Sequence, residues 1–290
     1  MQIKVENLTY VYSEKAKDLA TKALDNVSLL INEGDFFGVI GKTGSGKSTF
    51  IQHLNGLIKI GKNRGKITIG DYDLSQKGCD FKGLRAKLGM VFQYPEYQLF
   101  AETVFEDVAF GLKNFYKDIS DTEIEEMVKS ALQTVGLDYE KYKERSPFEL
   151  SGGQKRRVAI AGVIVTRPEV LVLDEPLAGL DPKGKKELTE LLKALHKSFV
   201  KTIVIVSHDM DFVAENCNQI AVFSDGKIVK TGTPKQVFLD EREIEELGLE
   251  MPLTAYLTQH LANQNLAIDN DFTVKDFCEA FCQEKGGKNL

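Results

Sequence analysis

The sequence has no excess of positive charge. Its 290 residues include 43 acidic and 37 basic side chains, which give a formal net charge of −6 at pH 7. Proteins that hold nucleic acid through its phosphates need clustered lysine and arginine, so no nucleic-acid partner is expected. The composition, 42% hydrophobic and 28% charged, is that of an ordinary soluble protein with one large domain or two modest ones.

Long hydrophobic runs are lacking as well. The longest run of apolar residues and glycine extends from Val158 to Val165, far short of the roughly 20 residues that span a bilayer. The amino-terminal residues, MQIKVENLTY, do not combine a charged start with an apolar stretch, so no secretory signal is expected. These absences predict a cytosolic chain, which can still dock on a membrane protein.

Cysteine is scarce and scattered. The four cysteines, Cys79, Cys217, Cys278 and Cys282, are too dispersed in a chain of this size for a disulfide framework. The last two would share one face of a helix, but two thiols without a second pair or a nearby histidine make a poor metal site. We therefore expect buried cysteines on a helix face rather than a metal centre.

Glycine, by contrast, is concentrated in residues 36–54, FFGVIGKTGSGKSTFIQHL. Residues 36–40 predict a short buried strand, residues 41–46 a loop, and the residues from Lys47 onward a helix. A strand, a glycine-rich loop and a helix in this order form a cradle for nucleotide phosphates. A plain glycine turn is the alternative, but the pattern G-x-x-x-x-G-K-[ST] in this context favours the cradle.

The residues of this loop have distinct expected roles. The glycines let the backbone N–H groups point inward, where the positive end of the following helix adds its partial charge. Lys47 can reach the β- and γ-phosphates, and the Ser48 hydroxyl can bind Mg²⁺. The candidate nucleotide-binding residues here are Gly41, Thr43, Gly44, Ser45, Gly46, Lys47, Ser48 and Thr49.

The apolar pattern of the chain predicts an α/β fold. Segments that alternate apolar and polar residues predict an antiparallel β region; they are residues 3–12, 23–35 and 64–74, with a turn at Gly70 and Asp71 and a polar loop at residues 13–22. Runs rich in Val, Ile and Leu at residues 169–176 and 201–209 predict strands buried on both faces, hence a parallel core sheet. Residues 219–232 predict a further β segment.

Two parts of the chain have a helical pattern instead. Residues 94–165 predict a helical insertion between sheet strands, in which Asp121 is expected to cap a helix and Gly136 to end it.

The second helical part follows the nucleotide-binding domain, which we expect to occupy residues 1–236. Residues 237–290 predict a helical extension with breaks near Gly248 and Pro252. Thr273 is expected to cap its last helix.

Two acidic residues follow the first buried run, VLVLDEP. Asp174 and Glu175 stand at the carboxyl end of the predicted strand, the edge at which open α/β sheets bind ligands. Asp174 can hold Mg²⁺, directly or through water, and Glu175 can then polarise an attacking water. The alternative, two carboxylates that merely cap a strand, is disfavoured by the phosphate loop upstream.

A second unusual stretch, LSGGQKRRVAIA, begins at Leu150. Ser151 suits a helix N-cap, and Gly152 and Gly153 leave backbone amides exposed. The pattern beyond Gln154 predicts a helix. The chain therefore offers a second anion-binding helix terminus, although the pentapeptide alone would also fit a simple capped helix.

Together these motifs resemble those of the ATP-binding subunits of ABC transporters. GKTGSGKS resembles Walker A, VLVLDE resembles Walker B, and LSGGQ is similar to the family signature. Gln93 falls at the Q-loop position, AGLD at residues 178–181 resembles the D-loop, and His208 in IVSHD resembles the switch histidine. The match covers residues 3–236 and implies an ABC-type P-loop ATPase with an antiparallel β subdomain, a helical insertion and a C-terminal helical extension.

The resemblance implies a site shared between two subunits. In this family two ATPase subunits pair head to tail, so that the signature of one closes over the Walker A site of the other and two ATP molecules are sandwiched between them. The residues that would complete the partner's nucleotide site are Ser151, Gly152, Gly153 and Gln154.

The resemblance also implies roles for individual residues. The catalytic residues would be Glu175 for the attacking water, His208 at the γ-phosphate and Lys47 on the phosphates; the Mg²⁺ ligands would be Ser48, Gln93 and Asp174. If an aromatic residue stacks on the adenine ring, we favour Tyr12, which stands at the edge of a loop. Packing within the strand is an equally open interpretation for Tyr10 and Tyr12.

A sharper resemblance is to the ATPases of energy-coupling-factor importers of vitamins and metal ions. It rests on GKTGSGKSTFIQHLNGL, FQYPEYQLFAETVFEDVAFG and LGLEMPLTAYL, the first of which is most similar to the second of two paralogous ATPases. The expected partners are a second ABC ATPase subunit, a transmembrane coupling subunit and a substrate-binding membrane component. The chain would then be a peripheral protein on the cytoplasmic face of the membrane, and its extension would add subunit contacts.

The family places its transmembrane contact between Gln93 and Val108. This segment mixes apolar and acidic side chains, namely Tyr94, Tyr97, Leu99, Phe100, Val104 and Phe105 with Glu96, Glu102, Glu106 and Asp107. Core packing would explain about half of the apolar residues. The others can form a groove for a cytoplasmic helix of the partner, with the acids facing its Arg or Lys.

Two other interpretations stay open at this level. One is the ATPase of another class of ABC transporter. The second is a soluble ABC protein that acts on ribosomes or DNA, although such proteins usually carry two cassettes or a long coiled-coil insertion, and this sequence has neither.

Overall fold

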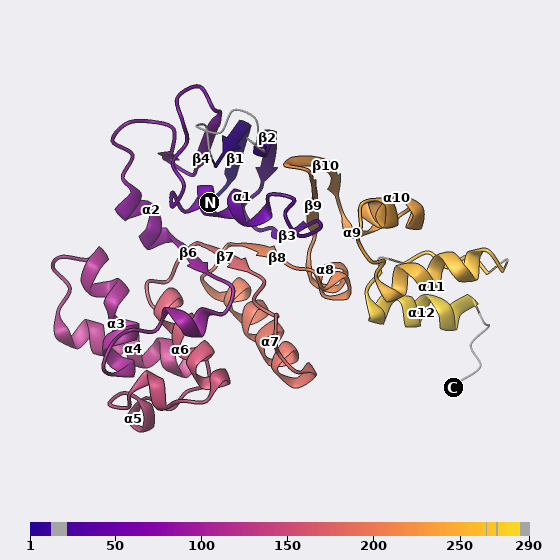
Figure 1. The fold of residues 1–290 in the computed structure, drawn as a ribbon. Helices are drawn as coiled ribbons and strands as arrows, with labels where there is room; N and C mark the ends of the chain where they lie inside the picture. Colours follow the sequence, from indigo (N-terminus) through magenta and orange to yellow (C-terminus); the bar gives the residue numbers. More distant parts are fainter. Residues whose placement is uncertain (13–21, 265, 271, 285–290) are drawn as a thin grey trace.

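The computed structural model describes residues 1–12, 22–264, 266–270 and 272–284 (Figure 1). Within these residues the strands form two sheets. The larger sheet lies at the centre of the molecule, with the smaller sheet on one side and most of the helices on the other. The predicted α/β class is confirmed.

The larger sheet has six strands in the order β10-β9-β3-β8-β7-β6. Their bounds are β3 Phe36–Ile40, β6 Leu88–Val91, β7 Val170–Asp174, β8 Thr202–Val206, β9 Gln219–Ser224 and β10 Lys227–Gly232. Neighbours run parallel except β10, which pairs antiparallel with β9. Alternate residues of β7 enter two different hydrophobic cores, Leu171 and Leu173 on the helical side and Val170 and Val172 on the side of the smaller sheet. The prediction of a parallel core buried on both faces is confirmed.

The smaller sheet is antiparallel, in the order β2-β1-β4-β5. Its strands are β1 Ile3–Val11, β2 Lys22–Ile31, β4 Lys66–Ile69 and β5 Tyr72–Asp73. Ile3 stands opposite Ile31 on one side and Ile69 on the other, so the buried faces of three strands coincide. The turn predicted at residues 70–71 joins β4 to β5. Residues 13–21 of the predicted polar loop lie outside the described residues.

Helix α1 Lys47–Leu54 begins directly after the glycine-rich loop and lies between the two sheets. Phe50, Ile51 and Leu54 are fully buried in the core that the sheets share. Helix α2 Phe81–Lys87 then leads into β6. The loop is therefore held between two packed elements, β3 and α1, which gives it a rigid base.

The predicted helical insertion is present below the large sheet in Figure 1. Its helices are α3 Val104–Phe115, α4 Asp121–Thr134, α5 Tyr139–Tyr142 and α6 Gly152–Ile164, with short 3₁₀ turns at Pro95–Gln98 and Pro147–Glu149. The prediction that Asp121 caps α4 is wrong by one residue. Ser120 Oγ accepts from the N–H of Glu123 at 3.2 Å, while the Glu123 carboxylate accepts from the N–H of Ser120 at 2.9 Å. Gly136, with φ 76°, follows the end of α4 as predicted.

The remaining helices are α7 Pro182–Ser198, α8 Met210–Asn216, α9 Pro234–Val237, α10 Glu241–Glu246, α11 Leu253–Ala262 and α12 Val274–Glu284. Breaks fall near Gly248 and Pro252 as predicted, and Thr273 Oγ1 accepts from the N–H of Asp276 at 3.2 Å at the start of α12. The short helix α9 spans the predicted boundary between residues 236 and 237, so this division of the chain stays a prediction.

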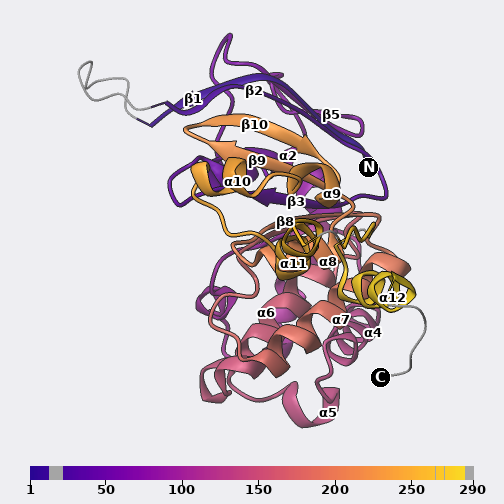
Figure 2. The same cartoon turned by 90° about the vertical axis from the view of Figure 1, so that its right-hand side faces the viewer.

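The prediction that Cys278 and Cys282 are buried is wrong, because both are exposed on α12. Helix α12 lies beside α11 at the edge of the molecule (Figures 1 and 2). The helical spacing placed both thiols on one face, but nothing among the described residues covers that face.

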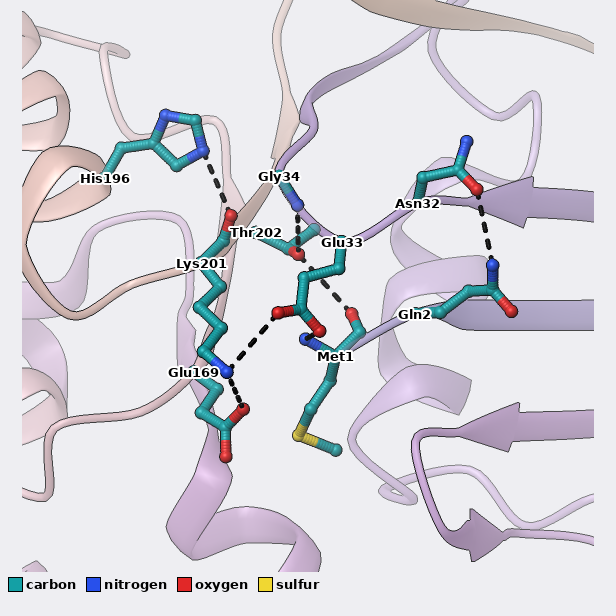
Figure 3. Close-up of polar contacts among 9 residues, drawn as sticks. All are labelled: Met1, Gln2, Asn32, Glu33, Gly34, Glu169, His196, Lys201 and Thr202. Carbon is teal, nitrogen blue, oxygen red and sulfur yellow. Dashed lines mark hydrogen bonds and ion pairs between the residues drawn. The ribbon is translucent and has the colours of Figure 1, made fainter.

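Polar contacts join the amino ends of the core strands to the smaller sheet (Figure 3). Lys201, which precedes β8, lies 3.3 Å from Glu33 and 3.2 Å from Glu169, which precedes β7. The amino group of Met1, next to β1, lies 2.8 Å from the other oxygen of Glu33. Hydrogen bonds from the Met1 amino group and from Lys201 lower the pKa of Glu33. This end of the sheet is therefore a network of solvated, paired charges.

Candidate nucleotide site

The glycine-rich loop is pressed against the backbone of two neighbouring strands. A β-carbon at Gly41, where φ is 146°, would lie 2.2 Å from the carbonyl oxygen of Phe223 in β9. One at Gly46, where φ is 107°, would lie 2.4 Å from the carbonyl oxygen of Ala23 in β2. Only glycine fits both places. The first N–H groups of α1, which have no partner inside the helix, are thereby presented at the carboxyl end of the sheet.

Lys47 is folded over this loop and is only 6% exposed. Its ammonium donates to the carbonyl oxygens of Gly41 at 2.6 Å and Lys42 at 2.9 Å. Burial lowers the pKa of Lys47, an effect that the negative charges of Glu175 and Asp174 oppose. A buried cation therefore stands at the helix terminus, where an anion would add to its stabilisation.

Ser48 and Asp174 meet at the bottom of the site. Ser48 Oγ lies 3.4 Å from Asp174 Oδ1, a hydrogen bond between the start of α1 and the end of β7. Burial raises the pKa of Asp174, while this hydrogen bond and the charge of Lys47 oppose the rise. Hydroxyl and carboxylate oxygens are ligands that Mg²⁺ prefers, and Gln93 lines the same cleft. The donor set at this place fits a magnesium ion.

Glu175 occupies a strained turn next to His208. Its φ of 48° is unusual for a residue with a side chain, and its N–H donates to the carbonyl of Val206 in β8 at 3.0 Å. Glu175 Oε2 accepts from the N–H of His208 at 3.3 Å. His208 Nε2 lies 3.1 Å from Glu175 Oε1 but is not aligned to donate, so Oε1 has no hydrogen-bond donor within the described residues.

The carboxyl of Glu175 is poised to exchange a proton near neutral pH. Burial raises its pKa to about 7, although the N–H of His208 and the charge of Lys47 oppose the rise. Burial and the charge of Lys47 lower the pKa of His208, which favours its neutral imidazole. A carboxylate with a pKa near the working pH is well matched to general base catalysis.

These groups line one cleft of about 980 Å³. The predicted site residues that line it are Tyr12, Thr43, Gly44, Gly46, Lys47, Ser48, Thr49, Gln93, Asp174, Glu175 and His208. Gly41 and Ser45 belong to the loop, but they are buried and do not line the cleft. Ser45 Oγ has no hydrogen-bonding partner among the described residues. The structure thus brings the predicted phosphate-binding, metal-binding and acid residues from separate segments of the chain to one cleft.

Tyr12 stands at the rim of the cleft and is 63% exposed. Its hydroxyl lies 2.9 Å from Thr49 Oγ1, and its ring meets Tyr10 edge to face with 5.0 Å between centroids. These two contacts fix the ring at the rim and leave most of its surface open. The position is suitable for stacking on a planar base.

The second predicted helix terminus is well formed but lies outside this cleft. Ser151 Oγ accepts from the N–H of Gln154 at 3.4 Å, and the Gln154 side chain accepts from the N–H of Ser151 at 3.0 Å. Gly152 and Gly153 are exposed, with open space where a β-carbon would stand. None of these four residues lines the cleft that contains Lys47. One chain therefore presents two helix termini that suit an anion, and they lie at separate places.

Comparison with known proteins decides the family. The sequence profile of the ABC transporter family matches residues 24–178. The chain belongs to the ABC transporter family. The energy-coupling factor transporter ATP-binding protein EcfA2 of Clostridium tetani is 50% identical over 276 residues, which cover 95% of this chain and 94% of that protein. A protein of the same name from Caldanaerobacter subterraneus subsp. tengcongensis is 45% identical over 292 residues, with 100% of both chains covered.

A solved structure agrees with this assignment. The protein cbiO1 of Clostridium perfringens, described as part of the ABC transporter complex cbiONQ, matches with a TM-score of 0.71 and 39% identity over 89% of this chain and 98% of that chain. This ABC ATPase is therefore an ATP-binding and ATP-hydrolysing subunit of the energy-coupling factor type. The sequence left open an energy-coupling-factor ATPase, another class of ABC transporter ATPase and a soluble ABC protein. These relatives favour the energy-coupling-factor ATPase.

In this ABC ATPase, two of the four acids in the segment 93–108 already have partners inside the chain. Glu96 accepts from the buried guanidinium of Arg156 at 3.3 Å. Asp107 accepts from the N–H groups of Phe100 and Ala101, both at 2.9 Å. Glu102 and Glu106 are exposed. Among the described residues, neither Glu102 nor Glu106 takes part in an ion pair.

Several residues of the cleft were not found from the sequence. Lys185 of α7 lines the cleft and pairs with Asp209 at 2.7 Å, directly after His208. Glu250 and Met251, from the link between α10 and α11, line it as well. Asp209 could have been inferred from its place beside His208 in IVSHD. Nothing in the local pattern places Glu250 and Met251 at a nucleotide site.

Proposed function

We propose that this chain is one half of a head-to-tail ATPase pair that powers an energy-coupling-factor importer of vitamins or metal ions. The observation that carries the proposal is the separation of the two anion-binding termini, with the cleft around Lys47 in one place and Ser151 in another. A single chain then holds one half of each of two nucleotide sites, and a second subunit has to supply the other halves. The ATP-binding cassette MJ0796, 30% identical with a TM-score of 0.70 over 80% of this chain and 98% of that chain, was solved as a dimer with ADP and Pi bound.

Within its own cleft the chain binds and activates the nucleotide. Lys47 and the first N–H groups of α1 hold the phosphates. Glu175 takes a proton from the attacking water through the unpaired oxygen Oε1, and His208 contacts the γ-phosphate. Ser48, Asp174 and Gln93 would hold Mg²⁺, which neutralises phosphate charge when bound, since all three line the same cleft. Tyr12 stacks on the adenine.

Across the pair the chain supplies the second terminus. The residues that contact the partner's nucleotide are Ser151, Gly152, Gly153 and Gln154. The exposed N–H groups of Gly152 and Gly153, at the start of α6, suit the γ-phosphate of a nucleotide held by another subunit. Binding of ATP therefore closes the pair, and hydrolysis reopens it.

Size measurements with a hydrolysis-deficient chain test the pairing. ATP should convert the Glu175→Gln variant from monomer to dimer, either alone or with a paralogous ATPase. Adding Ser151→Arg to the same variant should abolish the shift, because the bulky cation blocks the terminus that closes over the partner's nucleotide. Binding of ATP without any change in size under all these conditions would contradict the head-to-tail pair.

The proposed contact with the transmembrane coupling subunit lies between Gln93 and Val108 and on the facing part of α3. Here Tyr97 is 84% exposed, and Phe100, which is 58% exposed, meets Phe110 edge to face at 4.8 Å. Glu102 and Glu106 are exposed in the same segment. Exposed aromatic groups beside carboxylates suit an amphipathic helix that carries Arg or Lys.

Co-purification with the membrane subunit tests this contact. Phe100→Ser and Glu102→Lys should each reduce recovery of the complex, and Glu190→Lys on α7 serves as the matched exposed control. Glu96 is unsuitable for the test, because its removal would leave the buried Arg156 without its counter-ion and destabilise the fold. Undiminished recovery for both variants would remove this segment from the interface.

The remaining parts of the proposal concern the organisation of the chain. Residues 1–236 would be the ATPase domain, and residues 237–290 a helical extension that adds contacts between subunits. No helix in the described parts of the chain has the length and apolar character to cross a bilayer. We propose that the chain lies at the cytoplasmic face of the membrane, held there by the coupling subunit, with a separate membrane component that selects the substrate; its resemblance to energy-coupling factor transporter proteins supports this.

A further inference from the structure

The link between α10 and α11, taken with the first residue of α11 as residues 247–253, forms part of the wall of the nucleotide cleft. Glu250 and Met251 line the cleft in company with Thr43 and Gly44 of the phosphate loop. A β-carbon at Gly248 would lie 3.9 Å from Cβ of Lys42 in that loop. The link therefore lies close to the phosphate loop of its own chain.

This link is also anchored to the segment that carries His208. The N–H of Leu253, at the start of α11, donates to Asp211 Oδ1 in the first turn of α8 at 2.7 Å. Asp209, the N-cap of α8, pairs with Lys185 of α7 at 2.7 Å. Residues directly after His208 are therefore held by α7 on one side and by the C-terminal helices on the other.

The apolar side chains of the link keep it in place. Leu249 is buried in the core that the helices share with the large sheet, and Met251 packs against the same core. Glu250 lies between them in the sequence and is exposed. Because its two neighbours are fixed by packing, Glu250 is directed to the cleft while the link stays seated.

The carboxylate of Glu250 is not neutralised within the described residues, where it makes no ion pair or hydrogen bond. The lysines that line the cleft are already engaged: Lys22 with Asp25, Lys47 with two carbonyl oxygens, and Lys185 with Asp209. A nucleotide triphosphate brings several negative charges into the same cleft. Like charges in one cleft repel, and the repulsion weakens with added salt.

We propose that residues 247–253 are a wall of the nucleotide site and that Glu250 weakens nucleotide binding there by opposing the polyphosphate. The effect lasts while the link is seated on α8. By thermodynamic linkage, a bound nucleotide shifts the equilibrium between the docked and undocked link toward the undocked state, by the same factor by which docking weakens nucleotide affinity. The inference rests on the proposed nucleotide site and deepens it, since the C-terminal helices then respond to the nucleotide of their own subunit.

Nucleotide affinity of the purified full-length chain tests the repulsion. Calorimetry with Mg²⁺ and a non-hydrolysable ATP analogue at low ionic strength compares the wild type with Glu250→Gln and Glu246→Gln. Glu246 is exposed at the end of α10 but does not line the cleft, so it controls for net charge. Glu250→Gln should bind about two- to fivefold more tightly, with a gain that shrinks as salt is added. Glu246→Gln should match the wild type.

Two results would overturn the inference. One is equal affinity for Glu250→Gln and the wild type, and the other is an equal gain for both variants. A wild-type chain that binds no nucleotide at all would instead overturn the nucleotide site itself. The two failures are therefore distinguishable.

Amide hydrogen exchange tests the linkage separately. In the wild type, the nucleotide should speed exchange at the N–H of Leu253 and in the first turn of α11, because the bond to Asp211 opens more often. In Glu250→Gln the acceleration should be smaller. Exchange that does not change with nucleotide in the wild type would overturn the coupling to the C-terminal helices.

Discussion

The two ends of the parallel strands carry the same residue types with opposite properties. At the carboxyl ends, burial raises the pKa of Glu175 to about 7 and lowers the pKa of Lys47. At the amino ends, hydrogen bonds from the Met1 amino group and Lys201 lower the pKa of Glu33. Hydrogen bonds to Glu169 and Glu33 raise the pKa of Lys201.

The difference shows which effect wins at each end. In the network of Figure 3, Glu33 and Lys201 are exposed to solvent, so pairing sets the direction of the pKa shift. In the cleft, burial removes more solvation from Glu175 and Lys47 than their neighbours restore. At the carboxyl ends, burial raises the pKa of Glu175 into the range where it can exchange a proton, and it leaves the Lys47 cation poorly solvated and suited to bind an anion. Groups that favour their charged forms at the amino ends only stabilise the join between the sheets.

The largest effect is expected from the acids at the two ends of β7. Glu175→Gln should lower ATP turnover of the assembled ATPase pair by about 10²–10⁴-fold, the usual contribution of a general base, with ATP binding retained. Glu169→Gln, at the amino end of the same strand, should leave turnover unchanged. Steady-state phosphate release measures both. Turnover of Glu175→Gln equal to the wild type would contradict its role as the base.

The lysines give the next comparison. Lys47→Ala should weaken nucleotide affinity by about 10- to 100-fold, because it removes a charge-assisted hydrogen bond to phosphate. Lys201→Ala, at the other end of the sheet, should bind nucleotide as the wild type does. Calorimetric titration measures both affinities, and circular dichroism checks that each variant is folded. Unaltered affinity in Lys47→Ala would count against the phosphate cradle.

Removing the acid at each end of the parallel strands should change stability at neutral to basic pH in opposite directions. Folding raises the pKa of Glu175 from 4.5 to about 7. Its contribution to stability is therefore fully present below pH 4.5 and is lost as the pH rises through about 7. Glu175→Gln is then expected to be more stable than the wild type by about 1–2 kcal/mol near pH 8, after allowance for solvent screening. The gap should close toward about pH 5. Urea unfolding measures it, and a wild type that is the more stable near pH 8 would contradict the burial of this acid.

The smallest effect is expected at Glu33, with the opposite sign. Its pKa is lowered on folding, so its contribution is present above the ordinary pKa of 4.5 and is lost as pH falls through the folded value. Glu33→Gln should be slightly less stable than the wild type at neutral pH, and the difference should vanish in acid and in high salt. The same urea titration detects it. A Glu33→Gln variant more stable than the wild type at neutral pH would contradict the ion-pair network.

The parts of the fold that could be predicted depend on neighbours in the sequence. The strand, loop and helix around Lys47 are consecutive, and the strand before Asp174 is a continuous apolar run, so their local pattern was sufficient. Two local predictions were wrong for identifiable reasons. Ser120 competes with Asp121 one residue away and has a glutamate at the spacing that a capping box needs. The exposure of Cys278 depends on what covers α12, which helical spacing does not specify.

The printed order of residues was enough to indicate the chemistry of this chain, because each of its motifs is a short run whose side chains and backbone act together. It did not indicate which acidic side chains form ion pairs within the chain, such as the pair of Glu96 with Arg156. It did not indicate that Glu175 would titrate near pH 7, or that Glu250 would stand beside the phosphate loop. Burial and electrostatic interaction depend on every atom that surrounds a group, and most of those atoms come from distant segments that meet only in the folded chain.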